Sequence, residues 1–201
     1  VIAERAHAQG KLAHDTLVAT VMSNSGLERH LAGRGIRTIS TKVGDRHVVE
    51  RMRQTGCTVG GEQSGHIILS EFSTTGDGLV AALQALAAIR EAERPASEVL
   101  SRFAPLPQIT RNVPIERGSA PLDRPAVIDV IDRMTRRLEG TGRLMVRPSG
   151  TEPLVRIMAE GEDPDLLAAI ADEVSHVLRG DVLRGDVLPV RPCPAAFAAA
   201  P

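Results

Sequence analysis

The chain has 201 residues, 42% of them hydrophobic and 24% charged, which is typical of a globular protein with one large or two small domains. Its net charge of −1 and its lack of Trp and Tyr argue against nucleic-acid binding and against aromatic platforms for bases or sugars. The sequence has no signal peptide and no apolar run that predicts a membrane span, and its two cysteines fit neither metal nor disulfide spacing, so we expect a cytoplasmic protein without membrane contact.

Residues 1–104 predict an α/β domain of the three-layer type. The opening stretch VIAERAHAQG is typical of the end of an amphipathic helix, and we expect more protein before it. Strands and helices alternate after it, in an order typical of parallel pairing. The helix over 77–92 places Leu79, Leu83 and Leu86 on one stripe. The predicted elements are strands at 16–22 and 36–41, helices at 25–35 and 44–56, a hairpin over 57–72, and helices at 77–92 and 95–103.

Residues 105–180 predict a small α+β domain, an antiparallel sheet with two helices, which follows the linker APLPQI at 104–109. Asp163 and Pro164 are typical of a helix start, as the capping residue and the first-turn residue. Residues 181–201, which repeat RGDVL, predict a low-complexity tail. The predicted elements are strands at 108–115, 142–147 and 154–159 and helices at 123–138 and 164–178.

The stretch RPSGTEPLVR, residues 147–156, indicates an anion-binding loop between two strands. The guanidinium of Arg147 presents a planar fork that suits phosphate, and Pro148 biases its backbone toward extended geometry. Ser149 and Thr151 then offer hydroxyl donors, and Gly150 between them allows the backbone to approach an anion closely. The alternative is a plain turn whose hydroxyls bond locally. The candidate phosphate contacts are Arg147, Ser149, Gly150 and Thr151.

Arg156 lies among Leu, Val, Ile and Met on the second of these strands, where a charge requires a partner. Glu152 is one candidate partner. The other is the same phosphate, to which Arg156 would supply a second positive charge.

The stretch GGEQSGH, residues 60–66, indicates a second polar loop. Glu62 and Ser64 lie two positions apart, so in an extended loop they point the same way and can contact sugar hydroxyls. A solvated hairpin loop is the alternative. His66 is either a structural histidine or a group for proton transfer.

The stretch TKVGDR, residues 41–46, is a third candidate. Its functional interpretation places Lys42 and Arg46 beside an anionic ligand. The alternative is a simple helix start, with Asp45 near the positive end of the helix. With a single carboxylate it is not a metal site by itself.

These three loops, in this order and with STTGDG at 73–78, resemble the α-D-phosphohexomutase family over residues 1 to about 180. VGDR and the Gln of GEQSGH favour the branch that acts on glucosamine phosphate. The phosphomannose and phosphoglucose branches usually lack them and remain the alternative. The resemblance implies the third and fourth of four domains around a cleft, in which glucosamine 6-phosphate and glucosamine 1-phosphate interconvert through a bisphosphate.

The resemblance also implies roles for the loops. It implies that Glu62 and Ser64 bind sugar hydroxyls and that the loop after Arg147 binds the phosphate that is not reacting. Lys42, Asp45, Arg46 and Arg156 are further candidates for substrate contact, and His66 is the candidate catalytic residue.

Family members carry a phosphoserine loop in the first domain and a Mg²⁺ loop in the second, and neither is found in this sequence. We therefore expect Mg²⁺ to be bound by a domain missing from this chain, and the N-terminal domains of the same protein to be its partners. Alone, the chain is expected to bind a phosphosugar and to catalyse nothing. A non-catalytic phosphosugar-binding module is the competing hypothesis.

Overall fold

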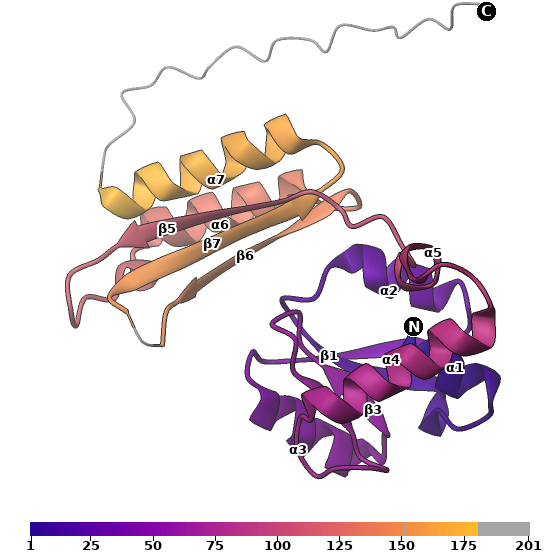
Figure 1. Cartoon of the computed structure of the whole chain (residues 1–201). Helices are drawn as coiled ribbons and strands as arrows, with labels where there is room; N and C mark the ends of the chain where they lie inside the picture. Colours follow the sequence, from indigo (N-terminus) through magenta and orange to yellow (C-terminus); the bar gives the residue numbers. More distant parts are fainter. Residues whose placement is uncertain (151, 181–201) are drawn as a thin grey trace, which may run out of the picture. The chain divides into compact units, whose positions relative to one another are not determined.

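The computed structural model describes residues 1–150 and 152–180. The chain divides into two compact units, Val1–Leu106 and Pro107–Pro201, each with its own core (Figure 1). The division falls within the stretch APLPQI, where the sequence places the linker. The predicted tail lies outside the described residues. Within those residues, no helix is both long and apolar enough to cross a membrane.

The first unit is an α/β domain built on a mixed sheet, as predicted. The sheet has the order β2-β1-β3-β4, in which β1 pairs in parallel with β2 and β3, and β4 returns antiparallel to β3 as a hairpin. The elements are α1 (Ile2–Ala8), β1 (Thr16–Thr20), α2 (Ser25–Ala32), β2 (Arg37–Thr41), α3 (Asp45–Thr55), β3 (Val59–Gly61), β4 (Ile67–Leu69), α4 (Gly78–Ala92) and α5 (Ala96–Leu100).

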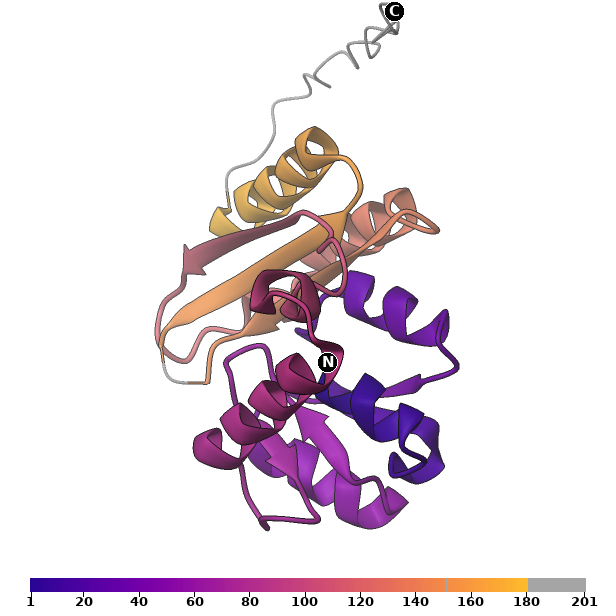
Figure 2. The ribbon, with the colours of Figure 1, turned by 45° about the vertical axis from the view of Figure 1, so that its right-hand side comes forward.

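This sheet has an apolar core on each face, which makes the unit three-layered. Successive side chains of a strand point to opposite faces, so neighbours in β1 enter different cores. Leu17 packs in the core that includes residues of α1, α2 and α4, whereas Val18 packs against Val48 and Met52 of α3. Figure 2 shows helices on both sides of this sheet.

Side-chain caps fix where several elements begin. Asp77 accepts hydrogen bonds from the backbone N–H groups of Leu79 and Val80 at the start of α4. Asn24 caps α2 by accepting a hydrogen bond from the Gly26 N–H. The same side chain accepts from the Leu106 N–H and donates to the Leu106 carbonyl, which holds the last residue of the unit against the start of α2.

The leucine stripe predicted on α4 faces solvent rather than the core. Leu79, Leu83 and Leu86 are 81, 64 and 59% exposed. The buried side of the helix carries the smaller residues Ala81 and Ala88, which allow α4 to lie close to the rest of the unit. The apolar spacing therefore identified the helix but not the side on which it packs.

A carboxylate near the start of the chain joins α1 to α2 and to the segment that follows α5. Glu4 of α1 accepts hydrogen bonds from Arg102 and contacts His30 of α2 at 3.0 Å and Arg34 at 2.7 Å. Burial alone would raise the pKa of Glu4. The hydrogen bond from Arg102, the N-terminal ammonium and the contact with His30 outweigh that effect and lower the pKa from its ordinary 4.5 to about 2.

This shift predicts an acid-sensitive first unit. A carboxyl whose pKa is lower in the folded state stabilises the fold fully above its unfolded pKa of 4.5, and this stabilisation is lost as the pH falls toward 2. We expect the melting temperature of the first unit to fall over that range more steeply in the wild type than in Glu4→Gln, as measured by calorimetry. Parallel pH profiles for the two proteins would contradict this assignment.

The second unit is a three-stranded antiparallel sheet with the order β5-β7-β6 and two main helices, as predicted (Figure 2). Both helices pack against one face of the sheet, where Val155, Ile157 and Ala159 of the central strand point. Asp163 caps the second helix as expected, accepting from two backbone N–H groups. The elements are β5 (Gln108–Pro114), α6 (Pro125–Arg137), β6 (Gly142–Pro148), β7 (Leu154–Gly161) and α7 (Pro164–Arg179).

Candidate functional site

Two of the loops singled out in the sequence meet in the first unit. The backbone N–H of Gly44, in the loop after β2, donates to Glu62 Oε1 in the β3–β4 loop at 2.7 Å. Gly44 has a φ of +122°, a backbone region that favours glycine, and it precedes the first residue of α3. The VGDR turn thus orients the carboxylate of the GEQSGH loop.

The second oxygen of this carboxylate belongs to a small polar cluster. Ser64 Oγ donates to Glu62 Oε2 at 3.3 Å and lies 3.0 Å from His66 Nδ1. His66 Nδ1 is 3.9 Å from Glu62 Oε2. The side chain of Glu62 is only 10% exposed, whereas that of His66 is 58% exposed. The cluster therefore combines a held carboxylate with an accessible imidazole.

The hairpin geometry presents these side chains. The Glu62 N–H donates to the His66 carbonyl at 2.9 Å, and the Gly65 N–H closes the turn onto the Glu62 carbonyl at 3.1 Å. A Cβ on Gly61 would lie 2.8 Å from the His66 carbonyl oxygen, so this position requires glycine. The turn holds Glu62, Ser64 and His66 on one short loop.

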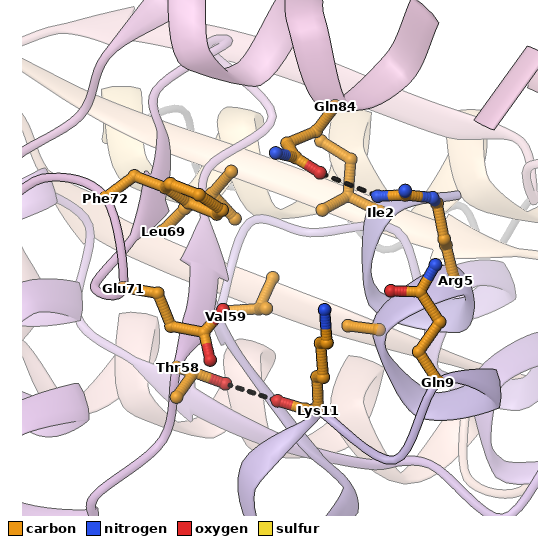
Figure 3. A pocket seen from close by; sticks show the side chains of 11 residues that line it. Ile2, Arg5, Gln9, Lys11, Thr58, Val59, Leu69, Glu71, Phe72 and Gln84 are labelled. Atoms are coloured by element: carbon orange, nitrogen blue, oxygen red, sulfur yellow. Dashed lines mark hydrogen bonds between the residues drawn. The ribbon is translucent and has the colours of Figure 1, made fainter. Parts of the chain in front are cut away.

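The other residues of the TKVGDR loop do not join this cluster. Asp45 Oδ1 accepts from the neighbouring Arg46 N–H at 2.7 Å, within the first turn of α3. Lys42 lines a separate cavity of about 420 Å³ with His47 and Glu50, and no residue of the 60–66 loop lines it. A smaller cavity of about 160 Å³, beside α1 and α4, contains none of the predicted site residues (Figure 3).

In the second unit, two arginines face each other across neighbouring strands. Arg147 of β6 and Arg156 of β7 are directly opposite in the antiparallel register, and Asn112 of β5 continues the row. Their neighbours Val146 and Ile157 point into the core beneath α6 and α7, so the two arginines lie on the opposite face of the sheet. Like charges in directly opposed positions repel each other, so an anion bound between the two guanidinium groups would offset this repulsion.

The charge of Arg156 is partly compensated. Its Nη2 binds Glu152 Oε2 at 2.9 Å, which is the partner that one sequence interpretation assigned to it. Its Nε is buried and has no hydrogen-bond partner within the described residues. Arg147 has no ion-pair partner among the same residues. The pair thus keeps donors for a ligand.

The loop that joins these strands borders a cavity of about 390 Å³. Ser149 and Gly150 line it, and a Cβ on Gly150 would meet open space, so the backbone is approachable there. Thr151, the other predicted hydroxyl contact, lies outside the described residues. Arg117, on the loop after β5, also lines this cavity. Sequence patterns did not indicate Arg117, because its proximity depends on the pairing of β5 with β7.

The described part of the chain does not fit a Mg²⁺ site. It contains no group of three His, Cys, Asp or Glu side chains placed to hold a metal ion.

Two family models match the chain in the order of its two units. The model of the phosphoglucomutase/phosphomannomutase α/β/α domain III matches residues 1–106, and that of the C-terminal domain matches residues 111–177. Together these matches cover most of the chain, which therefore belongs to the phosphoglucomutase/phosphomannomutase family, the phosphohexomutases.

The curated relatives are named more narrowly. The chain is 58% identical over 179 residues to a phosphoglucosamine mutase of Xanthobacter autotrophicus and 54% identical over 179 residues to one of Azorhizobium caulinodans. Each match covers 89% of this chain and 40% of the relative. The chain thus spans about 40% of the length of the curated relatives it matches.

Solved structures agree on the fold. Aspergillus fumigatus N-acetylphosphoglucosamine mutase matches with a TM-score of 0.72 at 19% identity, over 90% of this chain and 42% of that one. A structure of the same enzyme in complex with GlcNAc-6P and magnesium matches with a TM-score of 0.68 at 21% identity, over 88% and 44%.

Proposed function

We propose that this chain supplies the substrate-binding half of a phosphoglucosamine mutase, which interconverts glucosamine 6-phosphate and glucosamine 1-phosphate through a bisphosphate. Identity of 58% and 54% to proteins of that name, across both units, supports this choice over the phosphomannose and phosphoglucose branches. The polar character of the two loops supports the same class of ligand.

The observation that carries the proposal is the opposed pair Arg147 and Arg156. A phosphate dianion between the two guanidinium groups would replace their repulsion by charge-assisted hydrogen bonds. Ser149 and Gly150, which follow Arg147 in the chain and border a cavity that neither arginine lines, would add a hydroxyl and the backbone. In this assignment the second unit holds the phosphate that does not react.

The polar cluster of the first unit is assigned to the sugar. Glu62 Oε2 and Ser64 Oγ bond each other without ligand, and each would exchange that bond for a sugar hydroxyl. Glu62 Oε1 remains bound to the Gly44 N–H, which keeps the carboxylate oriented. His66, exposed and 3.0 Å from Ser64, is placed to accept or return a proton of a bound hydroxyl. We keep Lys42, Asp45 and Arg46 as secondary candidates for contact with the substrate.

Catalysis requires parts that we assign to other domains of the full-length protein. Mg²⁺ would neutralise charge on the transferred phosphoryl group, and the residues described in this chain do not fit it. The role of this half is to position the sugar and the idle phosphate, which lowers the barrier by orientation. We therefore propose that the chain alone binds substrate without turnover.

Arg147→Ala tests this function. We expect it to weaken the binding of glucosamine 6-phosphate by about 1.5–3 kcal/mol, or roughly 10- to 150-fold, because a charged hydrogen bond to phosphate is lost. Isothermal titration of the chain with the ligand measures the loss. The matched control is Arg133→Ala, since Arg133 on α6 pairs with Glu173. Equal affinities of Arg147→Ala and wild type would overturn the assignment.

A further inference from the structure

We propose that the ion pair between Arg143 and Glu160, called here the buried pair, positions the phosphate site of the second unit. It does so by fixing the register of β6 and β7, which keeps Arg147 opposite Arg156. This inference rests on the proposed function, since that function takes Arg147 and Arg156 as the phosphate contacts. Arg143 and Glu160 are therefore positioning residues, which act through the strands and do not touch the ligand.

The buried pair and the arginine pair lie on the same face of the sheet. Arg143 is directly opposite Glu160, four positions along β6 from the place where Arg147 is opposite Arg156. Side chains an even number of positions apart on a strand point to the same side, and this side is the one opposite α6 and α7. Four positions along a strand separate the two pairs by about 13 Å. Glu160 is thus too far from the arginine pair to contact the same phosphate.

The carboxylate of Glu160 ties the central strand to both of its neighbours. Arg143 of β6 donates from Nε to Glu160 Oε1 at 2.9 Å and from Nη2 to Oε2 at 3.4 Å. On the other side, Gln108 of β5 donates from Nε2 to Glu160 Oε2. The side chain of Glu160 is 1% exposed and that of Arg143 is 30% exposed. A fully buried charge therefore depends on the correct placement of both neighbouring strands.

Hydrophobic packing alone does not fix this register. A slip of one residue would turn the core residues of β6 toward solvent, so the apolar pattern resists it. A slip of two residues returns every side chain to its own face and meets no such resistance. In one direction it would place Met145 opposite Glu160 and Arg147 opposite Met158. In either direction Glu160 loses its opposed arginine, and a buried charge left without its partner is strongly destabilising.

The arginine pair itself acts against the register. Directly opposed like charges destabilise the pairing of their strands when no anion is bound. The ion pair between Arg156 and Glu152 offsets little of this, because the two side chains are 40% and 56% exposed. Without ligand, an attraction elsewhere on the same two strands has to offset the repulsion, and the buried pair supplies it.

The hairpin can transmit a change at the buried pair to the arginine pair. A Cβ on Gly142 would overlap the Glu160 carbonyl oxygen and would lie 3.0 Å from Gly161 Cα, so the strands are closely packed at this end. The register of β6 and β7 is continuous from Gly142 to Pro148. A displacement of β6 at Glu160 therefore also displaces Arg147.

The test measures the affinity of the 201-residue chain for inorganic phosphate, by NMR titration at a temperature where each protein is folded. Glu160→Gln removes the negative charge and Arg143→Gln removes the positive charge, and both can keep amide hydrogen bonds. Both should weaken phosphate binding by about three- to tenfold, less than Arg147→Ala, because the guanidinium is displaced and not removed. The electric field of the lost charge alone would give opposite changes, a gain of affinity for Glu160→Gln and a loss for Arg143→Gln.

The second readout is the pairing of the strands without ligand. Hydrogen exchange of the β6 amides from Met145 to Arg147 should become faster in both variants, relative to the amides of α7, because the hairpin opens locally. Arg143→Lys keeps the charge and should retain the phosphate affinity and the exchange rates of the wild type. Ile170→Ala is the control for general stability, since Ile170 belongs to the core on the other face. It should keep the phosphate affinity and accelerate exchange in β6 and α7 alike.

Three outcomes would overturn the proposal. The first is wild-type phosphate affinity and wild-type β6 exchange in Glu160→Gln. The second is an affinity loss in Ile170→Ala as large as that in Glu160→Gln, since general loss of stability would then explain both. The third is a gain of affinity in Glu160→Gln with a loss in Arg143→Gln, which is the effect of the field alone.

A further variant and a separate readout keep the test decisive. If Glu160→Gln does not fold, the double variant Arg143→Gln with Glu160→Gln leaves no unpaired charge at this place, and the same losses are expected of it. Unchanged phosphate binding in Arg147→Ala would count against the proposed function. The exchange of the β6 amides uses no ligand, so it would still decide whether the buried pair holds the register.

Discussion

Gly60→Val is expected to lower the free energy of unfolding of the first unit by about 3 kcal/mol, at the upper end of the usual cost of overpacking a core. A Cβ at this position would lie 2.6 Å from Met52 Sδ, 2.7 Å from Val48 Cγ1 and 3.1 Å from the Val18 carbonyl oxygen. These atoms belong to a packed core and to a strand backbone, so the two branches of valine require Val48 and Met52 of α3 to shift. Calorimetry of the substituted chain measures the loss.

Gly78→Val is the matched control for this prediction. Gly78 opens α4, and a Cβ there would meet nothing within 4 Å. Valine also has a higher helix propensity than glycine, so this substitution should change stability by no more than about 0.5 kcal/mol. A similar loss for both substitutions would show that close packing at Gly60 is not the cause.

Ile170→Ala should destabilise the second unit by about 2–5 kcal/mol. Ile170 of α7 is fully buried in the core that the two helices form with the sheet. Truncation removes its apolar contacts and leaves a cavity that the surrounding helix and sheet can only partly fill. Denaturation with urea, followed through the transition of this unit, measures the difference.

Ile128→Ala gives the comparison on the neighbouring helix. Ile128 of α6 is 48% exposed, so its truncation removes much less packing, and we expect a loss below about 1 kcal/mol. Equal losses of stability for Ile170→Ala and Ile128→Ala would mean that the packing of α7 is not central to the core of this unit.

Local chemistry in the sequence predicted most of the elements. Asp163 and Pro164 marked the start of α7, and the cap that Asp163 makes is confirmed. The order of strands and helices predicted a parallel arrangement, which β1, β2 and β3 confirm. Such signals are visible because capping and alternation depend on residues a few positions apart.

The contacts of the candidate site could not be predicted in the same way. The bond from the Gly44 N–H to Glu62 joins two loops through the packing of α3 on the sheet. The opposition of Arg147 and Arg156 depends on the register of a hairpin, and a shift of one residue would place them on different faces. Residue types alone do not determine either arrangement.

The leucine stripe of α4 is exposed, although its spacing is that of a packed helix side. Apolar spacing on α4 identified Leu79, Leu83 and Leu86 as one side of a helix, and that side packs against nothing within its own unit. Ala81 and Ala88, which are less hydrophobic, take the packed side because two elements approach closely there. Periodicity therefore did not distinguish the packed side of α4 from its solvent-facing side.

On the proposed function, the stability of the second unit should depend on the phosphate concentration of the solution, because Arg147 and Arg156 are opposed. A ligand that binds only the native state stabilises it by mass action, by about 2.7 kcal/mol at a concentration one hundred times its dissociation constant. Inorganic phosphate alone should thus relieve the repulsion between Arg147 and Arg156. In phosphate-rich surroundings the site would be occupied before any sugar arrives, and substrate would enter by exchanging one dianion for another.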